Sequence, residues 1–337
     1  MTARTGMDKM EKELAGSFSS SVKTELAMQK IRRREDALAL VSAFTLSIGS
    51  LTFVSDRRSW GIHYALTNRS AIELVSKLIS RHYSLECRLS EVEHERLRAH
   101  CYELLAFGEG LDEFLMETGF MSVDEAGEKS FLPAVPETAI RTETQKRLFV
   151  RGLFLACGTV TQPEKGYHAE LVLRHAALAD RASELLSRQG IEPKRTQRRG
   201  STVLYIKEGE RLEDLLAYIG ASEAMMVVSN ERIVKQAKNK ANRDVNCITA
   251  NLTRSADTAR KQAEDIELVL KTLGAEALGG ELVAVASARL NGQELSLSEL
   301  ADELGFGRSA VNYRLKKLEK LAKEIRGADC PPHGREK

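Results

Sequence analysis

Two apolar stretches of closely similar pattern occur in the chain. They read "LALVSAFTLSIGSL" at residues 38–51 and "LFVRGLFLACGTV" at residues 148–160. The spacing of their apolar side chains predicts a helix in each. Both stretches contain two small residues one turn apart and then a terminal glycine: Ala43, Ser47 and Gly49 in the first, and Gly152, Ala156 and Gly158 in the second. Small residues on one face let helices approach closely, so we expect the two helices to pack on each other.

The segments after the two stretches repeat one another in order. After the first come the strand patterns "SLTFV" and "GIHYALT", the amphipathic helix "RSAIELVSKLISRHY", two more strand patterns and the short helix "GLDEFLMETG". The same succession follows the second stretch. Matching positions are Gly61, His63 and Gly119 in the first copy, and Gly166, His168 and Gly220 in the second. The predicted fold class is therefore α+β, with a duplicated αββαββα unit.

The sequence pattern of the remaining third of the chain predicts only helices. Residues 230–274 contain no proline, and glycine only at the end. We interpret the asparagines of this segment as helix caps or hydrogen-bonded packing: Asn230, Asn239, Asn242, Asn246 and Asn251. The predicted divisions are a disordered N-terminus (1–16), a first half (17–120), a linker (121–140), a second half (141–226), a basic helical connector (227–275), an all-α domain (276–328) and a disordered tail (329–337).

The stretch "LSLSELADELGFGRSAVNYRLKKLEKLAKEI" predicts two crossing helices joined by a tight turn. Ser296 or Ser298 begins the first helix, Ala301 is small where the second helix comes close, and Gly305 permits the turn. The buried contacts are expected from Leu300, Leu304, Val311 and Leu315. This is the pattern of a helix-turn-helix motif, whose second helix enters the major groove of DNA.

The distribution of charge agrees with a polyanionic partner. The 337-residue chain has 50 Lys and Arg and 48 Asp and Glu, a net charge of +2. Two segments nevertheless carry +5 each: residues 231–261 have eight basic and three acidic residues, and residues 308–326 have seven and two. We therefore expect double-stranded DNA to bind the C-terminal third.

Individual roles on the second helix follow from residue chemistry. Arg308 could pair with guanine and Asn312 with adenine. The helix offers three further contacts near the same side, namely Ser309, Tyr313 and Lys316, and three expected phosphate contacts, namely Arg314, Lys317 and Lys320. The candidate secondary contacts are Lys235, Lys238 and Arg243 in the connector, and Lys194, Arg195, Arg198 and Arg199 in a predicted strand. The alternative for the last four is a solvated strand face.

The sequence offers little support for a disulfide, a metal site or a cofactor site. The five scattered cysteines form no CxxC pair, which argues against disulfides and zinc and indicates a reducing compartment: Cys87, Cys101, Cys157, Cys247 and Cys330. His63 and His168 lack neighbouring ligands, so we predict no metal. The GEG segments around Gly110 and Gly209 lack the context of a phosphate-binding loop, so we predict no cofactor.

One uncharged run requires a membrane check. Residues 37–55 carry no charge, but seven of them are serine, threonine or glycine, and the matching copy contains Arg151. No signal-peptide pattern precedes the run. We therefore expect no membrane segment and a cytoplasmic protein.

The doubled helix–glycine element resembles the LAGLIDADG motif of homing endonucleases. The resemblance implies two helices packed about a pseudo-two-fold axis, each followed by a saddle-shaped sheet. In active enzymes of that family an acidic residue precedes each glycine, and the pair holds divalent metal for phosphodiester hydrolysis. The positions here are Ile48 and Cys157, which cannot replace two carboxylates. The resemblance therefore implies a scaffold without nuclease activity.

The segments "RGLFLACGTVTQPEKGYHAEL", "NRDVNCITANL" and "SAVNYRLKKLEKLA" resemble the WhiA family of bacterial regulators, over about residues 17–326. That resemblance implies a cytoplasmic, nucleoid-associated regulator of transcription that binds promoter DNA and acts in sporulation septation, cell division or chromosome segregation. It also implies that the helix-turn-helix makes the main DNA contacts. Other transcription or division proteins are candidate partners.

Two alternatives remain open. The duplicated part could be a protein-interaction or ligand-sensing module with secondary DNA binding, in which case Ile48 and Cys157 would line an interface. The other alternative, an active nuclease, is disfavoured by the same two residues. Because the doubled core satisfies its own pseudo-symmetry, we expect a monomer.

Overall fold

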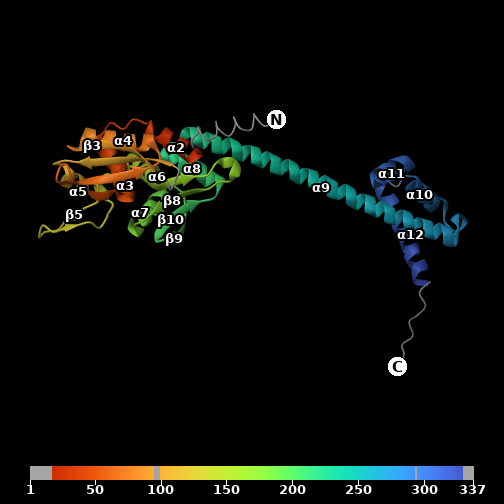
Figure 1. The fold of residues 1–337 in the computed structure, drawn as a ribbon. Coiled ribbons are helices and arrows are strands. Elements are labelled where there is room, and N and C mark those ends of the chain that lie inside the picture. Colours follow the sequence, from red (N-terminus) through yellow and green to blue (C-terminus); the bar gives the residue numbers. More distant parts are fainter. Residues whose placement is uncertain (1–16, 95–98, 293, 329–337) are drawn as a thin grey trace, which may run out of the picture. The chain divides into compact units, whose positions relative to one another are not determined.

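The computed structural model describes residues 17–94, 99–292 and 294–328. The chain divides into two compact units, residues 1–235 and 236–337. The two ends predicted to be disordered, and Cys330 with them, lie outside the described residues. Figure 1 shows the helices and strands of both units, coloured by their position along the chain.

The first half of the first unit follows the predicted order of elements. These are α2 (Phe18–Ala27), α3 (Arg34–Ile48), β1 (Ser50–Val54), β2 (Ser59–Leu66), α4 (Arg69–His82), β3 (Glu86–His94), β4 (Ala99–Phe107) and α5 (Leu111–Glu117). The strands form an antiparallel sheet in the order β1-β2-β4-β3, with α4 packed on it. Ile62, Tyr64 and Leu66 of β2 alternate into the core between the sheet and the helices.

The second half repeats this arrangement. Its elements are α6 (Glu143–Cys157), β7 (Gly158–Val160), the 3-10 turn η2 (Pro163–Lys165), β8 (Ala169–Leu173), α7 (Ala176–Ser187), β9 (Lys194–Arg198), β10 (Ser201–Ile206) and α8 (Gly209–Ile219). The strand order β7-β8-β10-β9 is that of the first sheet, element for element. The predicted duplication is confirmed.

The twin helices α3 and α6 pack against each other in the middle of the first unit (Figure 1). A Cβ atom built on Gly152 would lie 2.4 Å from the carbonyl oxygen of Leu40 and 2.9 Å from the Cβ of Ala43. The backbones of the two helices therefore touch at Gly152, which only glycine permits. The predicted close packing is confirmed.

Each half ends at a matched glycine with a left-handed backbone. Gly119 follows α5 with φ +76°, and Gly220 follows α8 with φ +93°. Glycine adopts this conformation without the steric penalty that other residues incur, so both helices end sharply.

The segment between the halves has more structure than the predicted linker. It contains the short strands β5 (Ser122–Val123) and β6 (Lys129–Ser130) and the 3-10 turn η1 (Glu137–Ala139). Ala139 and Ile140 are buried, and the Ala134 amide donates to the Gly119 carbonyl at 3.0 Å. The C-terminal part of the segment is thus packed against the rest of the first unit.

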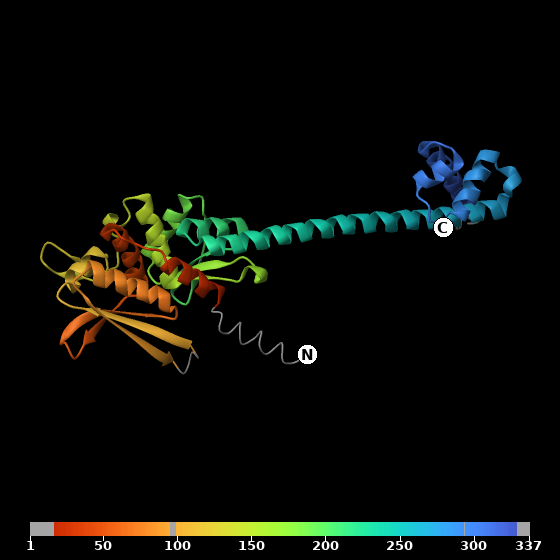
Figure 2. The same cartoon turned by 90° about the horizontal axis from the view of Figure 1, so that it is seen from above.

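A single helix, α9 (Ser222–Leu273), replaces the several helices predicted here (Figure 2). The interpretation of its asparagines as helix caps is wrong, because all five lie within the helix on exposed positions. Asn251 makes a hydrogen bond, donating from Nδ2 to the Cys247 sulfur at 3.8 Å. After α9 come η3 (Ala275–Ala277), α10 (Gly280–Asn291), α11 (Leu297–Leu304) and α12 (Arg308–Ala328). They form the core of the second unit together with the C-terminal part of α9, including Ile266 and Val269.

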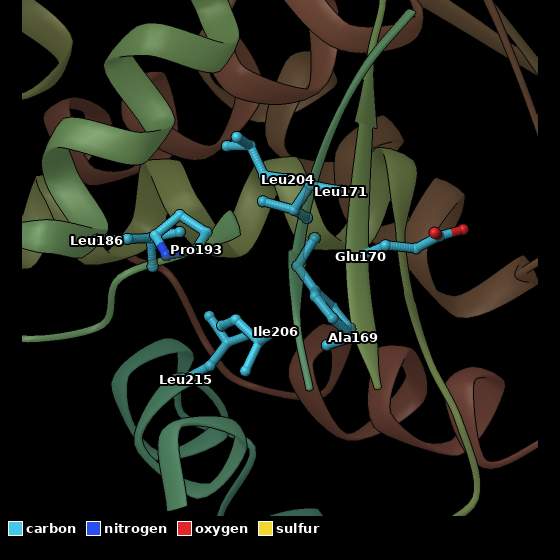
Figure 3. A pocket seen from close by; sticks show the side chains of 9 residues that line it. Ala169, Glu170, Leu171, Leu186, Pro193, Leu204, Ile206 and Leu215 are labelled. Atoms are coloured by element: carbon cyan, nitrogen blue, oxygen red, sulfur yellow. The ribbon is translucent and has the colours of Figure 1, made fainter. Parts of the chain in front are cut away.

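The second half of the first unit contains a small apolar cavity (Figure 3). Leu171, Leu186, Leu204 and Leu215 are among the residues that line its volume of about 10 Å³, and the carboxylate of Glu170 points away from it. A site of this size and lining holds at most one water molecule, so it is a packing void. Among the described residues, no helix is long and apolar enough to cross a membrane.

Candidate nucleic-acid interface

The turn between α11 and α12 forms as the sequence predicts. Ser296 begins α11: its hydroxyl accepts from the Glu299 amide at 3.3 Å, and the Glu299 carboxylate accepts from the Ser296 amide at 2.7 Å. This reciprocal cap satisfies two backbone donors of the first turn. Gly305 ends the helix in the left-handed conformation, with φ +66°. Leu300 and Ala301 are buried beneath α12.

The two faces of α12 differ in character. Its buried face consists of Val311, Leu315, Leu318 and Ala322. The other face is a stripe of residues three or four positions apart, which we call the α12 stripe: Ser309, Asn312, Tyr313, Lys316, Lys317 and Lys320. Tyr313 is 69% exposed, the lysines are exposed, and Asn312 is partly exposed. Arg308 is exposed at the first position of the helix.

Arg314 has partners within the protein. Its guanidinium pairs with Glu281 of α10, with the Nε atom 3.1 Å from the carboxylate, and lies 4.7 Å from the ring centre of Phe306. Only 18% of the Arg314 side chain is exposed. A phosphate contact from this residue would compete with an existing ion pair. Its position therefore suits holding α12 against α10.

The degenerate positions Ile48 and Cys157 lie at the C-terminal ends of the twin helices, and both are partly buried against the core. The Cys157 thiol donates to the Leu153 carbonyl at 3.2 Å. Burial raises the pKa of this thiol to about 11, so it is neutral near pH 7. Among the described residues, no group of three or more His, Cys, Asp and Glu is arranged to hold a metal ion.

A lysine brings positive charge to this place. Lys23 of α2 interacts electrostatically with Cys157, and burial lowers the pKa of the lysine to about 8. At neutral pH the ammonium group therefore carries a positive charge close to the ends of the twin helices. Such a charge repels a divalent cation, and Ile48 and Cys157 offer no carboxylate to offset that repulsion.

Comparisons with known proteins agree with both units. A family model described as "WhiA LAGLIDADG-like domain" matches residues 146–238, and one described as "WhiA C-terminal HTH domain" matches residues 241–322. The "Probable cell division protein WhiA" of Clostridium novyi (strain NT) is 35% identical over 314 residues, which cover 92% of this chain and 98% of that protein. This chain belongs to the WhiA family. The protein of the same name from Clostridium acetobutylicum is 34% identical over 92% of this chain and 98% of its own length.

A solved structure supports the fold. The full-length DUF199/WhiA from Thermatoga maritima has a TM-score of 0.57 and 24% sequence identity, and the match covers 91% of this chain and 98% of that one. The WhiA fold thus comprises both the doubled sheet unit and the helical unit described above.

The candidate secondary contacts are dispersed over this WhiA chain. Within the first unit, Arg195 pairs with Asp180, and Arg198 pairs with Glu170 at 2.9 Å. Lys194 is exposed on β9, while Arg199 lies in the turn after β9 with φ +51°. Lys194 and Arg199 are therefore better placed than Arg195 and Arg198 to contact a phosphate.

The three candidates on α9 also differ from one another. Lys235 donates to the Pro163 carbonyl at 2.6 Å and lies 4.9 Å from the ring centre of Tyr167. Lys238 is exposed, and so is Arg243, whose Nε atom donates to the Asn239 carbonyl one turn earlier. Lys235 therefore anchors α9 to the first unit, whereas Lys238 and Arg243 face solvent.

Sequence reasoning missed the residues that hold the junction of α8 and α9 against α2 and α6. Glu25 of α2 accepts from the backbone amides of Glu223 and Ala224 at 2.8 and 3.1 Å, and so caps the first turn of α9. Arg151, in the middle of α6, donates to the Ile219 carbonyl at 2.7 Å. Local pattern could not reveal these contacts, because the partners lie far apart in sequence.

Proposed function

We propose that this protein is a sequence-specific DNA-binding regulator of transcription that acts in bacterial cell division, chromosome segregation or sporulation septation. The observation that carries the proposal is the α12 stripe, an exposed basic face opposite a buried apolar face in a helix-turn-helix unit. A helix of this kind enters the major groove with its N-terminal residues at base edges. The relatives named probable cell division proteins support the cellular role.

We infer a division of labour along α12. Arg308 and Asn312 read bases, because a guanidinium pairs with guanine and a carboxamide with adenine. Lys316, Lys317 and Lys320 contact phosphates, which give affinity without sequence preference. Ser309 and Tyr313 lie beside them on the same stripe. In this proposal Arg314 holds the helix in place through Glu281.

We further propose that the protein acts as a monomer in the cytoplasm, at the nucleoid, through promoter DNA. Residues 276–328 form the DNA-binding domain, and residues 17–120 and 141–226 form the two halves of the scaffold. Of the secondary candidates, Lys194, Arg199, Lys238 and Arg243 add electrostatic contacts. The support for these statements is the exposure and charge of the residues concerned.

A binding series on the full-length chain tests the phosphate contacts. A duplex enriched from a random library by the protein itself serves as the fluorescent probe, and affinity is measured across a range of salt concentrations. Lys316→Met and Lys317→Met should each reduce the slope of log affinity against log salt by about 0.9. Lys271→Met is the control, because this exposed lysine lies on α9 in the second unit, outside the α12 stripe.

A salt-dependence slope for Lys316→Met and Lys317→Met equal to that of the control would contradict the proposed interface.

Base reading is tested by a separate measurement. Asn312→Ala should reduce discrimination between the selected duplex and single-base variants by about 1–3 kcal/mol at one position. Uniform weakening over all sequences would instead make Asn312 a backbone contact.

We propose no nuclease activity, since Ile48 and Cys157 replace the acids of the related enzymes. Incubating the full-length chain with the selected duplex and Mg²⁺ or Mn²⁺ should leave the DNA intact. Metal-dependent cleavage that Cys157→Ala abolishes would overturn this conclusion.

A second function, ligand sensing, has one observation in its favour: the first unit contains a groove with basic walls that DNA reading by α12 does not use.

A further inference from the structure

The groove lies between the α2–α3 connection and one face of α4. It encloses about 620 Å³. One wall is the segment Ala27–Arg32, and the other consists of Ser70, Glu73, Leu74, Lys77, Leu78 and Arg81. The latter residues are three or four positions apart, as along a single helix face. Helices α2 and α4 lie side by side in the first unit (Figure 1).

Four cations face this space. Lys30 and Arg32 belong to one wall, Lys77 and Arg81 to the other, and all four side chains are exposed. No ion pair within the described part of the chain involves any of them. Glu73 is the sole carboxylate of the lining, so four positive charges and one negative charge leave +3.

Glu73 does not neutralise these cations. Its carboxylate accepts from the Nε of Arg69 at 2.8 Å, and that arginine is outside the groove lining. The groove therefore keeps an excess of positive charge, which favours a ligand that carries several negative charges on a small frame.

The floor of the groove is apolar. Ile31 and Leu78 are buried, Leu74 is partly buried, and the Met28 side chain is 74% exposed beside them. A volume of this size falls within the range of small-molecule sites, roughly 300–1,000 Å³. An apolar ring could rest on this floor while neighbouring phosphate groups meet the four cations. These are the two parts of a nucleoside polyphosphate.

The wall of the groove is bonded to the start of α9. Gln29, which lines the groove, donates from Nε2 to the carbonyl of Gly220 at 2.6 Å. Gly220 ends α8 directly before α9, and Glu25 on α2 caps the first turn of α9. Helix α9 then continues into the second unit, which carries the α12 stripe.

We propose that this groove binds a nucleoside polyphosphate and that its occupancy changes DNA affinity through the contacts of Gln29 and Glu25 with the start of α9. The site would hold phosphate with lysine and arginine side chains and needs no glycine-rich loop. Ligand binding stands independently of the proposed function, whereas the effect on DNA rests on it.

The binding step is tested on the full-length chain without DNA, in EDTA. Calorimetric titrations use adenosine and guanosine triphosphates, the corresponding monophosphates, and inorganic tripolyphosphate. We expect a triphosphate to bind more tightly than either its monophosphate or tripolyphosphate, because both the phosphates and the apolar ring contribute. Lys77→Met and Arg81→Met should each weaken binding roughly tenfold, which corresponds to one lost charge-assisted contact. Lys207→Met, an exposed lysine directly after β10, is the control.

Three results would overturn the binding proposal. They are no triphosphate binding at millimolar concentration, equal affinities for tripolyphosphate and the nucleotides, and equal affinities for the Lys77→Met, Arg81→Met and control proteins. If the groove variants weakened only the binding of duplex DNA, the groove would be a nucleic-acid surface and the small-ligand proposal would fail.

The effect on DNA is measured by fluorescence anisotropy of the selected duplex, with and without saturating nucleotide. Saturating nucleotide should change the affinity for DNA by a certain factor. Because coupling is reciprocal, saturating DNA should change the affinity for the nucleotide by the same factor. Glu25→Ala, outside the groove lining, should reduce that factor while the nucleotide affinity of the DNA-free protein stays within about twofold. Unchanged coupling in Glu25→Ala would overturn the proposed route. Absent DNA binding would refute the proposed function and leave the nucleotide result standing.

Discussion

Replacing Gly152 by alanine inserts a methyl group where the backbones of α3 and α6 touch. The new Cβ atom would lie 2.4 Å from the Leu40 carbonyl oxygen and 2.9 Å from the Cβ of Ala43. The first of these atoms belongs to a helix backbone, and the second is fixed rigidly to one. Neither can rotate away, so the two helices must separate.

The magnitude follows from two opposing effects. Alanine favours helix over glycine by about 1 kcal/mol, which stabilises the variant. Overpacking a filled core costs about 1–3 kcal/mol, and a clash with backbone belongs at the upper end of that range. We therefore expect a net loss of about 2 kcal/mol in the free energy of unfolding. For a unit of this size that loss lowers Tm by roughly 4–8 °C.

Thermal unfolding followed by circular dichroism, with urea unfolding at one temperature, measures the effect in the full-length chain. Gly327→Ala is the control, because a Cβ at this position in α12 meets nothing within 4 Å. The control should unfold at or slightly above the wild-type temperature. If Gly152→Ala were as stable as the wild type, the backbones of α3 and α6 could not be in contact.

Three further predictions concern charge and capping. Lys23→Met should raise the free energy of unfolding at pH 7 by up to about 3 kcal/mol, since burial lowers the pKa of Lys23 from 10.5 to about 8 and the folded state bears the cost of the ammonium charge. Between pH 8 and 10.5 the wild type should gain stability, because Lys23 is deprotonated in the folded protein but still protonated in the unfolded chain. The stability advantage of the variant should therefore vanish by pH 10.5 in denaturant titrations. An advantage independent of pH would exclude desolvation of Lys23 as its cause. Arg314→Met should lower the stability of the second unit by about 1 kcal/mol through loss of the Glu281 pair and leave the salt dependence of DNA affinity unchanged, whereas a shallower slope would make Arg314 a phosphate contact. Ser296→Ala should cost about 1 kcal/mol in the same unit, measured by urea unfolding, and a neutral result would show that the hydroxyl cap at Glu299 contributes nothing.

The local features of the fold were predictable from the sequence. The order of helices and strands follows from apolar periodicity, and the glycines at positions 119, 220 and 305 mark helix ends because each requires a left-handed backbone. Ser296 and its partner Glu299 are three residues apart, the spacing that a capping box requires. Each of these signals lies within a few residues of the structure that it specifies.

The features that were not predictable depend on contacts distant in sequence. Nothing near Arg195 or Arg198 indicates that Asp180 and Glu170 will pair with them. The expected phosphate contact at Arg314 omitted Glu281, which α10 brings back from 33 positions earlier. Charge patterns along a chain thus show which residues are basic, but only the fold shows which of them are already paired.

The residues at positions 48 and 157 also set the electrostatic cost of packing the ends of the twin helices. Two carboxylates at positions 48 and 157 would repel each other at a partly buried place, and a bound cation would have to offset both that repulsion and their desolvation. An isoleucine and a neutral thiol impose neither cost, so the ammonium of Lys23 can remain near Cys157 without competing with a metal ion. In the proposed function, the scaffold therefore acts through its shape and its surface. In the proposals made above, the surfaces that act are the basic groove beside α4 and the α12 stripe, where Lys316 and Lys317 have no ion-pair partner within the described residues and Lys320 lies 3.8 Å from Glu324.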